Sequence, residues 1–82
     1  MTPLPPTPLT VERIRADVAD VLGEDPADIP DDENLVDHGL DSVRIMTLIE
    51  RWKREHGVEA AFVDLAGEPA IERWAPLLGA ER

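Results

Sequence analysis

The chain has 82 residues, which is room for one compact domain but little for a deep enzyme cleft with several precisely held groups. Its 18 acidic side chains outnumber 8 Lys and Arg, so a net charge of −10 opposes nucleic-acid binding and favours basic protein surfaces as partners. The chain has no cysteine, which excludes disulfides, thiol nucleophiles and Cys-based zinc sites.

The first nine residues contain four of the eight prolines and lack the layout of a signal peptide or a membrane span. We therefore expect a flexible arm over residues 1–9, a cytoplasmic protein and no membrane partner. A Pro-rich ligand for an SH3-like domain is the alternative for this arm.

A first amphipathic helix is predicted from Thr10 to Gly23, with Thr10 as N-cap and Gly23 as the left-handed residue that ends it. Its expected core residues are Val11, Ile14, Val18, Val21 and Leu22. Its other faces are filled by Glu12, Arg13, Arg15, Asp17 and Asp20.

The connection from Gly23 to Asp41 carries eight acidic side chains and no Lys or Arg. Ile29, Leu35 and Leu40 are spaced along it as anchors onto a core. The carboxylates do not fall in the register of an EF-hand, so we predict no calcium site. His38 and His56 have no cysteine and no second histidine nearby, so we predict no other metal site.

The second helix is predicted over Ser42 to His56, with Asp41 as N-cap and Gly57 as the stop. Its core stripe is predicted to be Ile45, Leu48, Ile49 and Trp52. At about 100° per residue, Val43 and Met46 then face outward. They form a docking patch, or they are isolated surface hydrophobes of the ordinary kind.

Two shorter helices are predicted after Gly57. The first covers Ala60 to Ala66, and the last begins with Pro69 at its first position. Its expected inward residues are Ile71, Trp74, Leu77 and Leu78. Pro76 should remove one intrahelical hydrogen bond and kink or shorten this helix.

A Gly-Leu-Asp-Ser turn delivers Ser42 to the start of the second helix. A phosphodiester on its hydroxyl would lie near unpaired N–H groups and the positive end of the helix dipole, and Arg44 is close enough in sequence to assist. The alternative is that Asp41 and Ser42 merely cap the helix.

The order of these elements resembles the acyl and peptidyl carrier proteins that bind phosphopantetheine, most closely the aryl carrier proteins of nonribosomal peptide and siderophore pathways. The resemblance covers about residues 10–78, and it rests on Asp41-Ser42-Val43-Arg44, Met46, Arg51-Trp52, His56-Gly57, Phe62-Val63, Leu65-Ala66, Pro69, Ile71, Trp74 and Leu77-Leu78.

The resemblance implies an all-α four-helix bundle with a short third helix and a long loop between helices one and two. A carrier domain over residues 10–79 and a tail over 80–82 follow. Ser42 would carry a 4′-phosphopantetheine arm from coenzyme A, and the protein would hold an acyl group rather than catalyse.

The resemblance also implies the partners, which are a phosphopantetheinyl transferase, a stand-alone aryl-acid adenylating enzyme and a condensation domain. Family positions place docking on Met46, Phe62 and Ala66, and helical geometry adds Val43. Part-burial of Phe62 in the core is the alternative for that residue. We expect a free-standing, monomeric carrier.

Three alternatives remain at this point. The cargo could be an amino acid or an aliphatic acyl group, or the chain could be an unmodified helical adaptor. A small hydrolase using Ser42 would need a base and an orienting acid, and the imidazoles of His38 and His56 fit loop-surface and helix-end roles instead.

Overall fold

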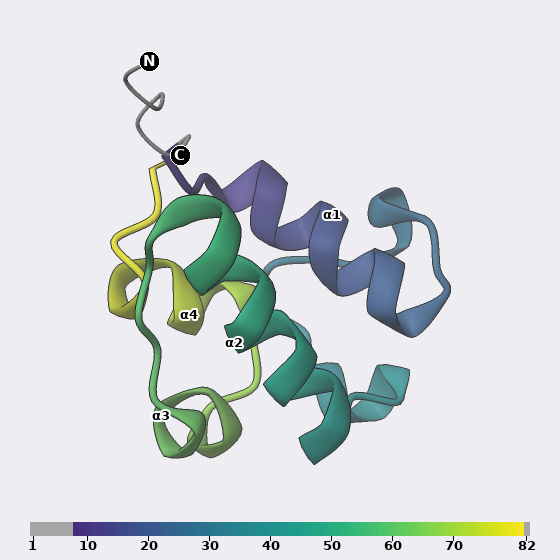
Figure 1. Ribbon diagram of the computed structural model, residues 1–82. Helices are drawn as coiled ribbons and strands as arrows, with labels where there is room; N and C mark the ends of the chain where they lie inside the picture. The colour runs from purple at the N-terminus through teal and green to yellow at the C-terminus, as the bar shows by residue number, and fades with distance from the viewer. Residues whose placement is uncertain (1–7, 82) are drawn as a thin grey trace.

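The computed structural model describes residues 8–81, so Met1 to Thr7 of the predicted arm lie outside the described part. Leu9, which was assigned to the arm, has a buried side chain. The Glu81 amide, in the predicted tail, donates to the Leu9 carbonyl at 3.1 Å, and the Val11 amide donates to the Glu81 carbonyl at 2.8 Å. The two ends of the described chain therefore meet, as Figure 1 shows.

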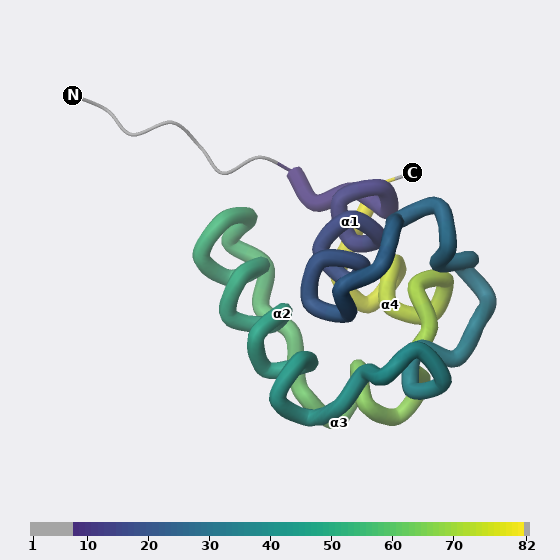
Figure 2. The backbone as a smooth tube through the Cα atoms, turned by 90° about the vertical axis from the view of Figure 1, so that its right-hand side faces the viewer, coloured from purple at the N-terminus to yellow at the C-terminus, as the bar shows by residue number. Residues whose placement is uncertain are grey.

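Within residues 8–81 the structure has four α-helices, and the predicted all-α fold class is confirmed. They are α1 (Val11–Leu22), α2 (Ser42–His56), α3 (Phe62–Gly67) and α4 (Ile71–Leu77). Two 3₁₀ turns, η1 (Pro26–Asp28) and η2 (Leu35–His38), lie in the long connection. The helices α1, α2 and α4 enclose the core, with α3 beside the start of α2 (Figure 2).

Each predicted cap of the two long helices is present. The Thr10 hydroxyl accepts a hydrogen bond from the Arg13 amide at 3.1 Å, and the Asp41 carboxylate accepts one from the Arg44 amide at 2.9 Å. Gly23 has φ of 70°, a left-handed conformation that an L side chain would strain. Both helix starts follow from a short polar side chain that accepts an otherwise unpaired N–H.

The long connection contains two 3₁₀ turns that were not predicted. Asp25 caps η1 by accepting from the Ala27 amide at 2.9 Å, and Pro26 supplies the fixed φ of its first position. The three predicted anchors, Ile29, Leu35 and Leu40, are all buried. Arg15 of α1 also holds the loop, because its Nε donates to the Ile29 carbonyl at 3.1 Å and its guanidinium pairs with Asp31.

Two tryptophans occupy the centre of the core. The rings of Trp52 on α2 and Trp74 on α4 meet edge to face, with centroids 6.0 Å apart and an interplanar angle of 75°. The Trp74 indole N–H donates to the Leu65 carbonyl at 3.0 Å, which ties α3 to α4. The core assignment of both tryptophans is confirmed, since both side chains are fully buried.

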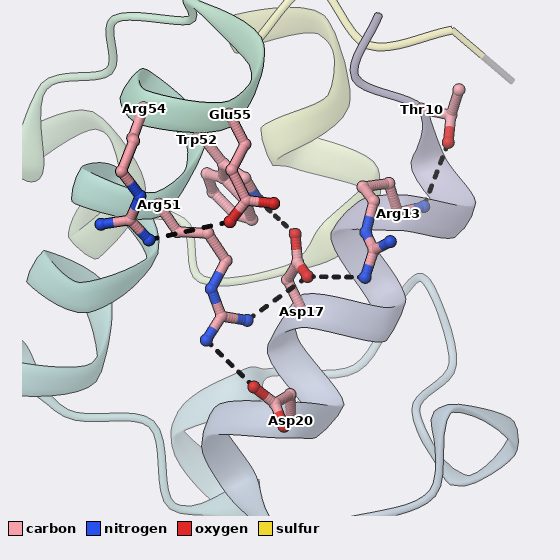
Figure 3. Close-up of polar contacts among 8 residues, drawn as sticks. All are labelled: Thr10, Arg13, Asp17, Asp20, Arg51, Trp52, Arg54 and Glu55. Atoms are coloured by element: carbon pink, nitrogen blue, oxygen red, sulfur yellow. Dashed lines mark hydrogen bonds and ion pairs between the residues drawn. The ribbon is translucent and has the colours of Figure 1, made fainter. Parts of the chain in front are cut away.

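Asp17 was assigned to the polar faces of α1, but the structure buries its side chain. It is 3% exposed and accepts the Trp52 indole N–H at 2.8 Å (Figure 3). Arg13 donates to its other oxygen at 3.0 Å, and Arg51 of α2 bonds to the same oxygen at 3.3 Å. Three side chains from two helices thus surround a buried carboxylate, and these partners compensate the cost of its burial.

The last helix also differs from the prediction. It begins at Ile71, so Pro69 lies before the helix and not at its first position. Pro76 lies inside this helix of seven residues, which continues to Leu77. Leu77 was expected in the core but is 51% exposed, because it falls outside the arc of Ile71 and Trp74 at about 100° per residue.

The remaining differences concern how deeply side chains are packed. Ala75 on α4 is buried, although it was not predicted to belong to the core. Val21, Leu22 and Ile49 only border the core as partly buried residues. They lie at the edges of the apolar stripes of α1 and α2, where a side chain contacts the core on one side and solvent on the other.

Candidate functional site

Ser42 is the first residue of α2, and its side chain is exposed. Asp41 before it has extended backbone angles, φ −137° and ψ 179°, and its Oδ1 accepts the Arg44 amide. The cap occupies one N–H of the first turn and leaves the serine hydroxyl clear of the core. The turn therefore presents a hydroxyl at the positive end of a helix of 15 residues.

The segment before Ser42 is anchored at several points. The Leu35 amide donates to the Pro69 carbonyl at 2.7 Å, which ties η2 to the segment before α4. Gly39 closes η2 with φ of 100°, a value that favours glycine. Leu40 is then buried two residues before the serine. The position of Ser42 is thus set by core contacts upstream and by α2 downstream.

His38 lies in this segment, and both of its ring nitrogens meet carboxylates. Nδ1 is 3.2 Å from the Glu24 carboxylate, and Nε2 is 2.8 Å from Glu33 Oε1. The hydrogen bond to Glu33, followed by the one to Glu24, raises the pKa of His38 above its usual 6.5. The imidazole joins the segment after α1 to the loop, and at 16% exposure its side chain is more buried than the expected loop-surface role implies.

The first turn of α2 contains no acidic side chain, so an anion on Ser42 would lie at the positive helix end, beside the Asp41 carboxylate of the cap. Arg44 is placed differently from the expectation that it assists such an anion. Its Nη1 donates to Asp41 Oδ2 at 2.7 Å, and its Nε donates to the Val21 carbonyl at 3.0 Å. The guanidinium is thus held between the cap of α2 and the end of α1.

The predicted docking residues are exposed beside this turn. Val43 is 74% exposed and Met46 is 52% exposed on α2. They line a shallow groove together with Thr47, Glu50, Arg51 and Arg54. On α3, Ala66 is exposed and Phe62 is 37% exposed, so the phenyl ring is accessible while part of it packs inward.

Val63 was missed as a possible member of this surface, although it is 72% exposed. Leu65 is the buried residue of α3, and Val63, two positions away at about 200°, faces outward. Arg51, near the end of α2, could have pointed into solvent as a positive charge at the negative end of the helix dipole. It instead bonds to Asp17 and, at 3.0 Å, to Asp20 of α1.

Among residues 8–81, no group of three or more His, Asp or Glu side chains is arranged to hold a metal ion. None of the helices in the described part is long and apolar enough to cross a membrane.

A family model described as "Phosphopantetheine attachment site" matches residues 12–78 of the chain. The match begins in α1 and ends just after α4, so it spans all four helices and the Ser42 turn.

Three relatives illustrate the range of proteins that share this segment. Isochorismatase of Bacillus subtilis (strain 168) is 58% identical over 69 residues, which cover 84% of this chain and 22% of that protein. Acyl carrier protein ScoB of Streptomyces coeruleorubidus is 44% identical over 77 residues, covering 94% of this chain and 89% of ScoB. Phenyloxazoline synthase MbtB of Mycolicibacterium paratuberculosis is 47% identical over 75 residues, covering 92% of this chain and 6% of that protein. The chain thus spans about a fifth of the isochorismatase and most of ScoB.

Proposed function

Since this chain belongs to the phosphopantetheine attachment family, and is therefore a carrier of a covalent 4′-phosphopantetheine arm and not an enzyme, we propose that Ser42 bears that arm. The observation that carries the proposal is the exposed hydroxyl at the first position of α2, in a capped turn inside the matched segment. The first turn of α2 fits a phosphodiester, because it has unpaired N–H groups and no acidic residue of its own, and the Asp41 carboxylate at its cap is paired with Arg44.

The residues around Ser42 hold its turn in place and keep its hydroxyl exposed to a partner enzyme. Asp41 and Arg44 hold the start of α2, Leu40 anchors the turn from below, and the serine hydroxyl projects from the fold. When attached, the arm supplies a terminal thiol that holds an acyl group as a thioester. The carrier proteins of this type serve nonribosomal peptide and siderophore biosynthesis, which agrees with the family first suggested by the sequence.

The proposed cargo is an aromatic acid, such as a hydroxybenzoate. The relative named phenyloxazoline synthase supports this choice, since its name denotes a phenyl-bearing product. The similarity to a protein named acyl carrier protein supports a second candidate, an amino-acid or aliphatic cargo. Loading assays with aryl-acid, aminoacyl and fatty-acyl adenylating enzymes separate the two, because only the matching enzyme should acylate the arm.

The proposed partners are a phosphopantetheinyl transferase, a stand-alone aryl-acid adenylating enzyme and a condensation domain. We assign their contact surface to Val43 and Met46 on α2 with Phe62 and Ala66 on α3. The two helices pack against each other, so these apolar side chains lie on neighbouring elements near the start of α2. Docking of a partner would remove these exposed apolar side chains from water, which favours binding.

Intact-mass spectrometry tests the attachment site. The protein is incubated with coenzyme A, magnesium and a broad-specificity phosphopantetheinyl transferase, and the variants Ser42→Ala and Thr10→Ala are treated in parallel. Thr10→Ala is the matched control, because it removes a hydroxyl from the start of the other long helix. We expect one phosphopantetheine on the wild type and on Thr10→Ala, and none on Ser42→Ala. A folded, initially unmodified wild type that gains nothing would refute the carrier assignment of Ser42 and favour an unmodified helical adaptor.

A further inference from the structure

Arg44 follows Ser42 by two residues and joins two segments that are distant in the sequence. Its Nε donates to the Val21 carbonyl at 3.0 Å, in the last turn of α1. Its Nη1 donates to Asp41 Oδ2 at 2.7 Å, at the cap of α2. One side chain therefore connects the residue before Ser42 to the end of another helix.

The end of α1 is suited to receive a cation. Carbonyls in a last helical turn lack intrahelical partners and carry the negative end of the dipole. The amides of Gly23 and Glu24 bond to the carbonyls of Ala19 and Asp20, one turn back. The last turn of α1 has no basic residue of its own, so Arg44 supplies both a donor and a positive charge from α2.

The same contact fixes the cap of α2 twice. Asp41 accepts the Arg44 amide through Oδ1 and the Arg44 guanidinium through Oδ2. The Arg44 side chain is 44% exposed and that of Asp41 is 52% exposed, and ion pairs in such positions contribute little to global stability. What the arrangement supplies is a defined orientation for the turn that carries Ser42.

We propose that Arg44 is a positioning residue for attachment of the arm, because it clamps the Ser42 turn to the end of α1. The inference rests on the proposed role of Ser42. A hydroxyl that must be aligned with coenzyme A in a transferase reacts faster when its own backbone is held in one orientation. Loss of the clamp lets the first turn of α2 fray and widens the set of directions that the hydroxyl samples.

Steady-state kinetics of phosphopantetheine transfer test this role in Arg44→Gln, Arg44→Lys and Arg73→Gln. The matched control, Arg73→Gln, removes the same charge from an exposed site on α4. We expect Arg44→Gln to lower kcat about tenfold with little change in KM for the carrier, as for a misplaced reacting group. Arg44→Lys should recover part of the loss, because an ammonium keeps the charge and reaches one of the two acceptors, and Arg73→Gln should equal the wild type.

An unchanged kcat in Arg44→Gln would overturn the proposal, and so would a rise in KM alone, which indicates direct contact with the transferase. Amide hydrogen exchange gives a second readout that needs no partner. We expect faster exchange at the Arg44 and Ile45 amides in Arg44→Gln, with the Trp52 amide unchanged, and equal exchange at Arg44 would overturn the clamp. A wild type that takes up no arm would instead refute the proposed function, while the exchange result still reports on the clamp.

Discussion

Asp17 and Trp52 form the buried polar link between α1 and α2, with the indole N–H donating to the carboxylate at 2.8 Å. Arg13 and Arg51 both donate to the other oxygen of this carboxylate (Figure 3). A charge in this position is tolerated only while its partners are present, because its own hydration is lost. The pair therefore sets how α1 and α2 face each other.

Asp17→Ala is expected to destabilise the fold by about 2–4 kcal/mol, since the indole N–H and the Arg51 guanidinium lose their buried acceptor. Asp20→Ala removes an acidic group from the same helix that also pairs with Arg51 but is 66% exposed. Its effect should stay below about 1 kcal/mol. Urea unfolding of both variants measures the difference, and equal losses would show that burial of Asp17 is unimportant.

The His38 imidazole should titrate with a pKa above 6.5, since Glu33 and Glu24 favour its charged form. A raised pKa in the folded state means that the stabilisation is fully present below the unfolded pKa of about 6.5. It is lost as pH rises through the folded pKa. Glu33→Gln should lower the pKa of His38 more than Glu24→Gln, because the Glu33 hydrogen bond contributes most.

Proton NMR titration of the imidazole signals checks this order, with His38→Gln identifying the His38 resonance. A His38 pKa at or below about 6.5 in the wild type would contradict the bridge to the two carboxylates. Thermal unfolding across the neutral pH range gives the matching stability trend, which should be weaker in His38→Gln.

Met46 and Leu77 provide a matched pair for the docking surface, because they are 52% and 51% exposed on different helices. Met46→Glu should slow acyl transfer to the condensation partner by about tenfold or more, since a charge would be buried in an apolar contact. Leu77→Glu should leave the rate unchanged. Equal slowing by both variants, or by neither, would count against the assignment of docking to α2.

Ionic strength should affect the rate of loading by the adenylating enzyme. The net charge of −10 should attract a basic docking site, and salt reduces the screening length from about 8 Å at about 0.15 M to about 3 Å at about 1 M. We expect kcat/KM for the carrier to fall as salt rises. Rates that do not change between these salt concentrations would contradict electrostatic steering.

Local rules explain what could be read from the chain. Thr10, Gly23, Asp41 and Gly57 were predicted as helix ends because capping depends on one side chain and the adjacent backbone. The exposure of Ser42 followed from its place at the start of a helix. The helical periodicity of α4 also predicts that Leu77 faces solvent, so its assignment to the core could have been avoided from the sequence.

Asp17, Arg44 and Arg51 could not be placed from the chain alone. Each appears as an ordinary charged residue on a helix, and each has a decisive partner at least 23 residues away on another helix. Whether a carboxylate is buried or solvated depends on which donors the neighbouring helix brings to it.

The sequence by itself determined the presence of four helices, the caps of the two long ones, the tryptophan core and the serine at the start of α2, since these depend on periodicity and on contacts within a few residues. Only the tertiary structure decided that Asp17 is buried, that His38 bridges two carboxylates and that Arg44 ties the Ser42 turn to α1. Those roles arise when helix packing brings distant charges within hydrogen-bonding distance, and helix packing is not encoded in any local stretch of the chain.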